Sequence, residues 1–367
     1  MLVLSVQLRD FRTYARAEAR LGEGLTVLHG ANGAGKSNLL EAVYFGCTGH
    51  SQRTRNEREL VRFGARTARV LVVLRDGDRR HELAVGISPG IEKHMSADGV
   101  AVQRMTEVDQ RPLVSVFFPD RLELIKGPPA ARRSHVDQLI AALWPARASV
   151  RREYARALAQ RNALIAGIRA GRSTRSTLPS WDLELARHAL ALRDHRARLV
   201  DMLCGPFAER ADQLGLVGRC ELSYRPRTSA ASEQDLMAEL AERLEQDLRR
   251  GFCTHGPHRD ELAILRDGRE LRSYGSQGEQ RLALLALLLA ERSLLADERG
   301  TTPLMLLDDV MSELDVHRRE LLAEELSGGG QSVIATTDVG HVPGASRSGA
   351  TLLSVSPGVV VQEAIAA

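Results

Sequence analysis

The sequence has no apolar run long enough to cross a membrane. Its longest run, Leu282 to Ala290, is far shorter than the ~20 residues that a bilayer requires. The first six residues also lack the basic segment and the cleavage site of a signal peptide. We therefore expect a cytoplasmic protein that has no membrane partner.

Cysteine is scarce, and the few cysteines are scattered. None of them forms a C-x-x-C pair, so their spacing predicts neither a disulfide framework nor a zinc site. They are Cys47, Cys204, Cys220 and Cys253.

Lysine is scarcer still, because only Lys36, Lys93 and Lys126 occur among fifty basic residues. Arginine supplies the rest, and it is unevenly placed: between Lys126 and Val200 there are fifteen basic residues against five acidic ones. The formal net charge of the whole chain is only +3. Such a local excess is typical either of a solvated surface with acidic partners or of a surface that binds nucleic acid.

One of the three lysines lies in a phosphate-binding loop. The sequence fits G-x-x-x-x-G-K-[ST] over Gly30-Ala31-Asn32-Gly33-Ala34-Gly35-Lys36-Ser37. A β-branched apolar run, Leu25 to Leu28, predicts a buried strand before the loop, and residues 37–45 have the apolar spacing of a helix. We expect backbone N–H groups of the loop, with Asn38 just beyond it, to surround nucleotide phosphates while Lys36 reaches the outer ones.

A second strand ends in two carboxylates, as the acidic motif of phosphate-loop ATPases does. Leu304 to Leu307 is apolar, and Asp308 and Asp309 follow. We predict that Ser37 and Asp308 hold Mg²⁺ and that Asp309 activates the attacking water, with Lys36 as a further catalytic residue. Ser312-Glu313-Leu314-Asp315 then begins the next helix.

A third motif, Ser276-Gln277-Gly278-Glu279, opens a strongly apolar helix. Ser276 and Glu279 have the spacing of a capping box, so the segment is at least a well-capped helix start. A helix start that presents Ser276 and Gly278 is also suited to anions, and both interpretations can hold together.

The order of these motifs predicts an α/β nucleotide-binding head interrupted by a mostly helical domain. We expect the head to comprise residues 1–118 and 251–367, and residues 119–250 to form the insertion, with long helices over 149–170, 180–214 and 230–250 and no extended coiled coil. The arginine excess lies in this insertion. We take as candidate DNA-binding residues Arg147, Arg151, Arg152, Arg156 and Arg161.

The full set of motifs resembles the RecF family, whose members share the ABC-type ATPase head of SMC-like DNA repair proteins. Two stretches carry the resemblance most specifically: Pro119-Asp120 through Lys126-Gly127 with Arg132-Arg133 and Asp137, and Asp308-Asp309 through Ser312-Glu313-Leu314-Asp315 with Arg318. Arg9-Asp10-Phe11-Arg12 and Gly256-Pro257-His258-Arg259-Asp260 are also similar.

The resemblance implies a weak, DNA-stimulated ATPase that uses ATP and Mg²⁺ in recombinational gap repair. It implies that Arg12 contacts the nucleotide and that Ser276 and Gly278 complete the site of a second chain in an ATP-dependent, head-to-tail homodimer. Such a dimer would clamp double-stranded and single-stranded DNA at gapped junctions. Its partners would be RecR and RecO and, indirectly, RecA.

Three other functions share part of this pattern. The ATPase subunit of an ABC transporter would have a shorter helical subdomain and a switch histidine where Thr337 stands. A GTPase is disfavoured because the chain has no Asn-Lys-x-Asp. A processive DNA motor would use the same ligands and differs only in translocating along the strand. His258 lies in a turn and is expected to be a hydrogen-bonding residue rather than a catalytic base.

Overall fold

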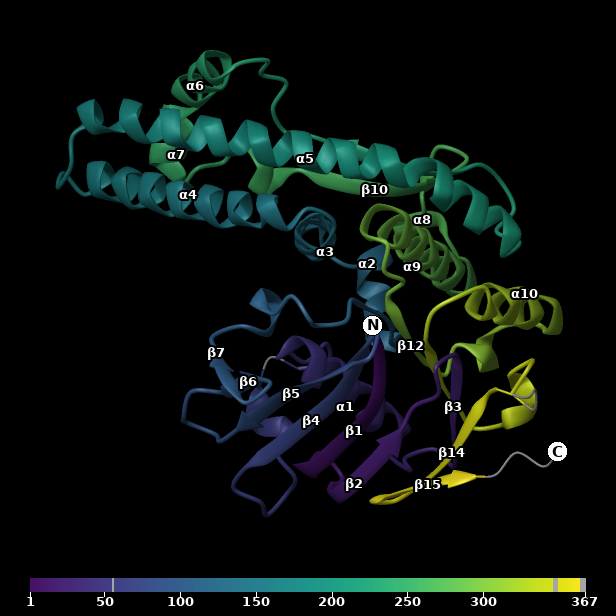
Figure 1. The fold of residues 1–367 in the computed structure, drawn as a ribbon. Helices are drawn as coiled ribbons and strands as arrows, with labels where there is room; N and C mark the ends of the chain where they lie inside the picture. Colours follow the sequence, from purple (N-terminus) through teal and green to yellow (C-terminus); the bar gives the residue numbers. More distant parts are fainter. Residues whose placement is uncertain (55, 346–348, 364–367) are drawn as a thin grey trace. The chain divides into compact units, whose positions relative to one another are not determined.

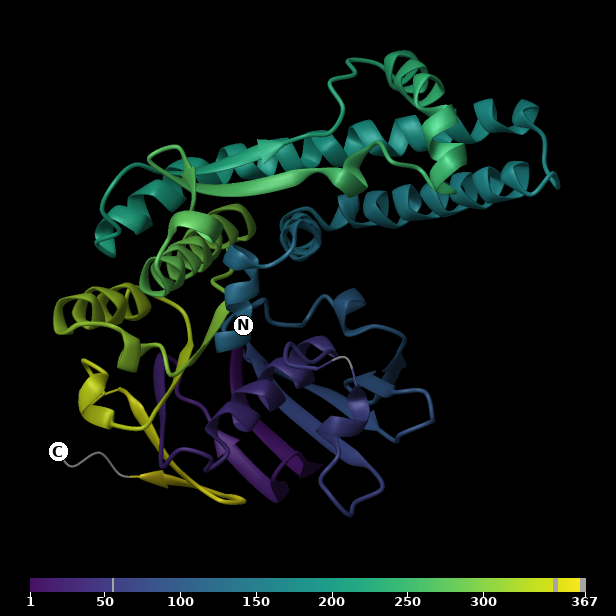
Figure 2. The ribbon, with the colours of Figure 1, turned by 180° about the vertical axis from the view of Figure 1, so that it is seen from behind.

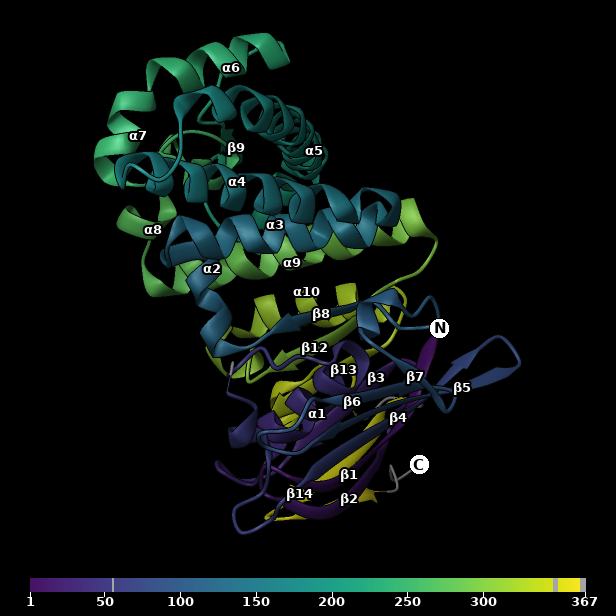
Figure 3. The ribbon, with the colours of Figure 1, turned by 90° about the vertical axis from the view of Figure 1, so that its left-hand side faces the viewer.

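The structure is a computed structural model that describes residues 1–54, 56–345 and 349–363. The chain forms two compact units. Unit 1 comprises Met1–Arg121, Gln213–Gly215 and the chain from Leu295 onward, whereas unit 2 comprises Leu122–Asp212 and Leu216–Leu294. Figures 1, 2 and 3 show the ribbon from three sides. No helix of the described residues combines the length and the apolar character needed to cross a membrane.

Unit 1 contains an antiparallel sheet with the strand order β2-β1-β4-β5-β6-β7. Its strands are β1 Leu2–Phe11, β2 Tyr14–Arg20, β4 Ala68–Asp76, β5 Arg79–Ile87, β6 His94–Ala97 and β7 Val100–Val102. Strands β4 and β5 form a hairpin and pair on either side of Gly77 and Asp78.

The second sheet of unit 1 is mostly parallel, in the order β15-β14-β3-β13-β12-β8. Its strands are β3 Leu25–His29, β8 Val114–Phe117, β12 Leu304–Asp308, β13 Ser332–Thr336, β14 Thr351–Ser356 and β15 Val359–Glu363. The central strands β12 and β13 are buried along their whole length, as strands covered on both faces are.

Helix α1, Lys36–Thr48, packs against strands of both sheets of unit 1 and therefore lies between them (Figure 3). The resulting core joins the inner side chains of the antiparallel sheet, such as Val70 and Val72, to those of β3 and β13. The side chain of Gln331 joins the sheets as well, because it exchanges hydrogen bonds with both backbone groups of Val3, at 2.9 and 2.7 Å. The remaining helix of unit 1 is α10, Val316–Ser327, with the short 3₁₀ segments η1 Glu57–Leu60, η2 Met105–Glu107, η7 Met311–Glu313 and η8 Val339–His341.

Unit 2 is built mainly of helices. They are α2 Glu123–Lys126, α3 Pro129–Leu143, α4 Ala148–Arg169, α5 Leu178–Gln213, α6 Glu233–Glu242, α7 Leu244–Arg250, α8 Leu271–Tyr274 and α9 Gln277–Arg299, with 3₁₀ segments η3 Pro119–Leu122, η4 Pro145–Arg147, η5 Arg175–Thr177 and η6 Pro257–Arg259. Helices α5, α9 and η3 run past the limits of the unit. Helices α4 and α5 lie side by side (Figures 1 and 2). Tyr154 and Ile165 of α4 share a core with Leu185 and Leu192 of α5.

Two predictions about the middle of the chain are wrong. The helix expected over 230–250 is two helices that meet at Arg243. The block expected to be almost all helix also contains strand β9, Cys220–Arg225, which pairs with β10, Glu261–Arg266, and through it with β11, Arg269–Glu270. Because β9 and β10 pair, the chain after residue 251 belongs to unit 2 as far as Leu294, so the compact units divide at positions other than the expected domain boundaries.

Candidate nucleotide-binding site

The phosphate-binding loop joins β3 to α1, as the sequence predicts. Gly30, Gly33 and Gly35 all have positive φ, at 155°, 78° and 115°. A Cβ atom on Gly30 would lie 2.1 Å from the carbonyl oxygen of Val355, and one on Gly35 would lie 2.8 Å from the Tyr14 hydroxyl. These two positions therefore require glycine for lack of space as well as for conformation.

The middle of the loop is exposed to solvent, whereas its end is buried. Ala31, Asn32 and Gly33 are exposed, whereas Ala34, Gly35 and Lys36 are buried. No side chain caps the first turn of α1, so its leading N–H groups have no partner within the helix and are available to an anion. The Tyr14 hydroxyl donates to the carbonyl oxygen of Gly35 at 3.0 Å, and burial raises the pKa of Tyr14 to about 12, which keeps that donor protonated.

Lys36 lies folded against its own loop. Its Nζ donates to the carbonyl oxygens of Gly30 and Ala31 at 2.7 and 2.9 Å. Burial lowers the pKa of Lys36, and the charges of Asp308 and Asp309 oppose that shift. The ammonium group is therefore held at the loop by neutral acceptors, which negatively charged phosphate oxygens can replace with stronger bonds.

The two predicted carboxylates leave the end of β12 in different environments. Asp308 is buried, and burial raises its pKa, an effect to which Asp309 adds and which a hydrogen bond from Ser37 opposes. Asp309 has a positive φ of 52°, and its Oδ1 is buried without a hydrogen-bond partner among the described residues. Asp309 therefore has an acceptor that is free to receive a proton or a hydrogen bond from water.

The residues at this point fit a magnesium ion. Ser37 and Asp308 are already in contact through their side-chain oxygens, and a cation would relieve the unfavourable burial of the Asp308 carboxylate. Mg²⁺ prefers a small number of protein oxygens and completes its shell with water and phosphate oxygens. Both predicted metal ligands are thus brought together, beside the first turn of α1.

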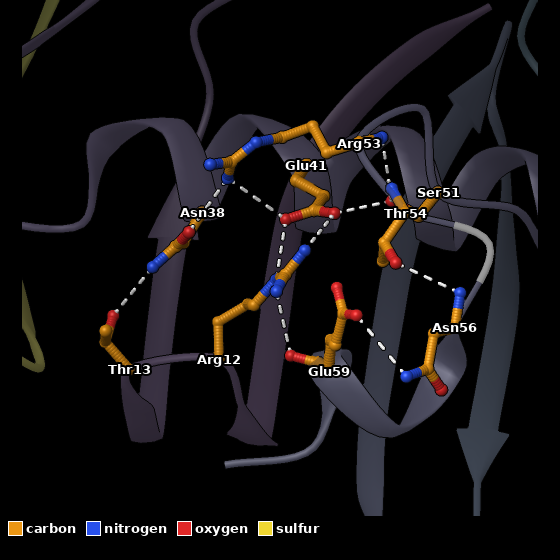
Figure 4. A network of polar contacts seen from close by, with 9 residues as sticks. All are labelled: Arg12, Thr13, Asn38, Glu41, Ser51, Arg53, Thr54, Asn56 and Glu59. Atoms are coloured by element: carbon orange, nitrogen blue, oxygen red, sulfur yellow. Dashed lines mark hydrogen bonds and ion pairs between the residues drawn. The ribbon is translucent and has the colours of Figure 1, made fainter. Parts of the chain in front are cut away.

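A polar network, drawn in Figure 4, surrounds the other side of the first turn of α1. Its centre is Glu41, a fully buried carboxylate on α1. Arg12 donates to both of its oxygens at 2.9 Å, and Arg53 donates to one of them at 3.2 Å. Ser51 donates to Glu41 as well, at 2.5 Å. One carboxylate therefore orients two guanidinium groups.

The network also includes Asn38, a predicted nucleotide-binding residue. Arg53 donates to its Oδ1 at 3.0 Å, and its Nδ2 donates to the Thr13 hydroxyl at 3.1 Å. Sequence reasoning missed Glu41 and Arg53, although a charged residue among the apolar positions of α1 was a usable signal. It did select Arg12, which the structure places in the same network.

Ser276 begins α9 in unit 2 and makes the predicted capping box. Its hydroxyl accepts from the N–H of Glu279 at 3.3 Å, and its own N–H donates to the Glu279 carboxylate at 2.8 Å. Ser276, Gln277 and Gly278 are all exposed, while the helix that follows is buried from Leu282 to Ala290. The hydrogen bond from Arg266 is the main reason that the pKa of Glu279 is lowered.

The basic residues of η4 and α4 divide into a surface set and a buried one. Arg151, Arg152 and Arg156 are exposed, and the guanidinium of Arg147 stacks 4.7 Å from the centre of the Trp144 ring. Arg161 is the exception. It is fully buried and donates to Asp182 and Asp247, each at 2.7 Å. Its charge is therefore neutralised inside unit 2, and the structure excludes Arg161 from a DNA-binding surface.

Comparison with known proteins identifies the family. A model described as "RecF/RecN/SMC N terminal domain" matches residues 2–350. A DNA replication and repair protein RecF from Streptomyces avermitilis is 38% identical over 98% of this chain and 99% of its own. The RecF of Gloeobacter violaceus is 34% identical, with 98% of each chain covered. The chain belongs to the RecF family.

Solved RecF structures have the same fold. One, described as the recombination mediator protein RecF-ATP in the RecFOR pathway, is 28% identical and has a TM-score of 0.88, with 99% of this chain and 97% of that chain covered. An SMC head bound to the C-terminal winged-helix domain of ScpA is 18% identical, with a TM-score of 0.61, and so shows the fold alone. Membership of the RecF family confirms the ABC-type head predicted from the sequence and favours it over the transporter subunit.

His258, in one of the stretches that resemble RecF, is a hydrogen-bonding residue as expected. Its Nε2 lies 3.0 Å from the carbonyl oxygen of Cys253, which can only accept, so Nε2 carries the proton. Nδ1 then accepts from the Tyr154 hydroxyl at 2.6 Å. Burial is the main cause that lowers the pKa of His258 to about 4. Both ring nitrogens are engaged in the neutral form.

This burial predicts a pH dependence of stability. The pKa of His258 is about 4 when folded and about 6.5 when unfolded, so between those values the unfolded chain binds the extra proton. The stabilisation is complete above pH 6.5 and decreases as the pH falls towards 4, by an amount on the order of 3 kcal/mol. Urea unfolding of the parent and of His258→Gln at pH 7.5 and 4.5 measures it. The parent should lose more stability than the variant, and an equal loss in both would contradict the assignment.

Proposed function

We propose that this protein is an ATP-dependent DNA-binding ATPase of recombinational gap repair and replication restart. The observation that carries the proposal is the pairing of a phosphate loop with two carboxylates at the end of β12. Family membership supports it, since the curated relatives are named DNA replication and repair proteins and a solved relative is described with ATP.

The roles of the residues follow from their positions. The N–H groups of Gly33 to Ser37 and the ammonium of Lys36 bind the phosphates of ATP, and Arg12 and Asn38 line the same end of α1. Ser37 and Asp308 hold Mg²⁺, which screens the charge of the phosphates. Asp309 accepts a hydrogen bond from the attacking water through its unpartnered Oδ1 and orients that water for in-line attack.

The ATP-bound state is proposed to be a homodimer with two-fold symmetry. The exposed start of α9, with Ser276 and Gly278, would cover the nucleotide held by Lys36 of the other chain. Bound ATP then holds the two protomers together, and its hydrolysis lets them separate. The turnover expected is slow, because each cycle requires the dimer to form and open.

The partner of the dimer is proposed to be DNA near a junction of single and double strands. The exposed arginines of α4 supply a basic surface, and the guanidinium groups of Arg147 and Arg198, which lie 4.7 and 5.2 Å from the centre of the Trp144 ring, extend it. The further partners proposed are RecR and RecO, which with this protein would assist the loading of RecA on single-stranded DNA.

Sedimentation of the full chain with ATP and Mg²⁺, with ADP, and with gapped DNA tests this function. We expect a dimer only with ATP, and retention on DNA only in that state. Strand displacement or translocation along DNA would support a motor instead. A protein that remains monomeric and free of DNA in ATP would contradict the proposal.

The surface of α4 gives a sharper prediction. Arg152 and Arg156 are exposed and have no ion pair among residues 1–54, 56–345 and 349–363. Replacing both with Gln should lower the slope of log K against log[salt] by about 1.8, since each phosphate contact contributes ~0.9. The matched control replaces Arg175 and Arg187, exposed arginines of unit 2 that pair with Glu245 and with Glu184 and Glu233. An unchanged slope in the first variant would remove α4 from the DNA surface.

A further inference from the structure

The antiparallel sheet of unit 1 carries a row of like charges on its outer face. Arg9 of β1 lies directly opposite Arg16 of β2 on one side and Arg69 of β4 on the other. All three are exposed. Like charges in directly opposite positions of an antiparallel sheet repel each other and destabilise the pair. Three in a row is therefore an arrangement that folding alone does not favour.

Acidic neighbours do not relieve this repulsion. Among the described residues none forms an ion pair with Arg9, Arg16 or Arg69. The nearest carboxylate along β2, that of Glu18, lies 3.7 Å from Arg20 instead. In the next strand the row continues with Gly86, which lies opposite Arg69 and has no side chain, and then with His94. The row therefore consists of three arginines, a glycine and a histidine, and it includes no carboxylate.

The face that carries the row is the one turned away from α1. Leu8 and Val70, which alternate with Arg9 and Arg69 along their strands, point into the core that contains α1. The arginines line an open groove of about 760 Å³, whose other wall includes Gly358 and Val360 of the β14–β15 hairpin. Both walls belong to unit 1.

We propose that Arg9, Arg16 and Arg69, with the groove that they line, bind the phosphate backbone of duplex DNA. The inference rests on the proposed function and adds to it a second surface, separate in sequence from α4 and on the other compact unit. The motifs of the chain do not indicate this surface, because Arg69 is distant in sequence from Arg9 and Arg16 and joins them only through the pairing of β1 with β4.

The geometry of the row fits a DNA strand. Neighbouring strands of a sheet lie about 4.8 Å apart, so the row spans about 10 Å from Arg16 to Arg69. One DNA strand rises 3.4 Å per phosphate along the helix axis, and the backbone path between phosphates is longer than this rise, so the row can face about two to three phosphates. Long arginine side chains can adjust to the remaining mismatch and make bidentate contacts with phosphate.

The lining also indicates which nucleic acid the groove accepts. None of the described residues that line it is aromatic, whereas proteins that hold single strands combine basic groups with aromatic rings on which bases stack. Apart from the arginines, the described lining includes the amide of Gln7, the carboxylate of Glu18, which pairs with Arg20, and otherwise short or apolar side chains such as Ala15 and Val359. We therefore assign the groove to the backbone of a duplex, without reading of base sequence.

The test uses the full chain with ATP and Mg²⁺ and a fluorescent 30-base-pair duplex. The variant Arg9→Gln/Arg69→Gln should lower the slope of log K against log[salt] by about 1.8. A matched control, Arg20→Gln/Arg75→Gln, removes the same charge from the same sheet, where the arginines pair with Glu18 and Glu23, and should change the slope by less than about 0.5. A single strand of equal length should compete poorly for the surface in the parent protein.

A second measurement separates binding from folding. Without DNA, the Arg9→Gln/Arg69→Gln variant should melt at a higher temperature than the parent, and added salt should raise the melting temperature of the parent more than that of the variant. A variant less stable than the parent would show that the arginines are structural and would overturn the proposal. An unchanged salt slope would also overturn the proposal. An equal loss of affinity for the duplex and for an acidic peptide would overturn it as well.

The outcomes distinguish this inference from the function on which it rests. A parent protein that fails to bind duplex DNA with ATP contradicts the proposed function, and the groove assignment falls with it. A parent that binds, together with an Arg9→Gln/Arg69→Gln variant of equal slope, leaves the function standing and removes only this surface.

Discussion

Replacing Lys36 with alanine should greatly weaken nucleotide binding, whereas Asp309→Asn should leave binding intact and greatly slow hydrolysis. The difference follows from what each side chain contacts. Lys36 is held at the loop by the carbonyl oxygens of Gly30 and Ala31, where its ammonium meets phosphate charge already present in the ground state. The buried Oδ1 of Asp309 has no hydrogen-bond partner in the part of the chain that the structure describes, and we expect it to act on the attacking water and so to contribute mainly in the transition state.

The expected magnitudes are large for both variants. Loss of the charge-assisted bonds of Lys36 is worth about 3 kcal/mol, or roughly a hundredfold in the dissociation constant for ATP. Loss of a positioned general base typically lowers turnover by about 10² to 10⁴. Titration with ATP and phosphate-release assays on both variants give the two quantities separately.

Each of these variants has a control in the chain. Lys126→Ala removes an exposed lysine of unit 2 and should leave ATP affinity unchanged. Asp338→Asn removes an exposed carboxylate that follows the neighbouring parallel strand β13, and it should hydrolyse ATP at the parent rate. Hydrolysis at the parent rate by Asp309→Asn would move the role in water activation to another residue.

The sequence predicts the phosphate loop and the acidic strand end well because both are local. The loop glycines lie in one short stretch with Lys36 and Ser37. The backbone conformation of this stretch, between β3 and α1, fixes how these residues are arranged. The contact of Ser37 with Asp308 needed one further assumption, that parallel strands of the same sheet end at the same edge. That assumption holds for a sheet in which each parallel strand is followed by a loop and a helix.

The failures come from pairings that are not local. Arg161 was grouped with its neighbours by sequence, yet its spacing from Tyr154, Ala157 and Ile165 puts it on the buried stripe of α4. Its partners Asp182 and Asp247 lie on other helices, and only the fold brings them to it. Strand β9 was missed for the same reason, because it is stabilised by pairing with β10 some forty residues later.

The network around Glu41 also depends on contacts between residues that are not local in sequence. Glu41 is a charged residue among the apolar positions of α1, but the residues that pair with it come from the β1–β2 turn and from the segment after α1, which spacing alone does not indicate. Their convergence orients Arg12 and Arg53 beside the helix end at which phosphates are expected to bind. The sequence therefore indicates which groups contact the nucleotide more readily than it indicates what holds those groups in place.

Ser276→Arg is expected to abolish ATP-induced dimerisation while leaving ATP binding to the monomer nearly intact. The residue is exposed at the start of α9, and it lies on a different compact unit from Lys36, Ser37 and Asp308, which remain unchanged. An arginine there would block the approach of a second chain to the nucleotide. Hydrolysis should fall to near background, because the site is never completed.

Loss of the helix cap is the alternative cause that must be separated. Removing the Ser276 hydroxyl costs α9 its bond to the N–H of Glu279, typically about 1 kcal/mol. Ser232 makes an equivalent capping box with Asp235 at the start of α6 in the same unit. Ser232→Arg should therefore lower stability by a similar amount and still dimerise in ATP.

Mixing two defective proteins gives the most specific result. A heterodimer of Ser276→Arg and Lys36→Ala chains contains one site with both defects and one with neither, since the intact Ser276 of one chain can cover the intact loop of the other. Analytical ultracentrifugation with ATP and Mg²⁺ should show dimers in the mixture although neither protein dimerises alone, with at most half of the parent ATPase activity per dimer. If Ser276→Arg alone still dimerised on ATP, the capping box would be the whole role of that serine, because a site shared between chains cannot close over an arginine at its centre.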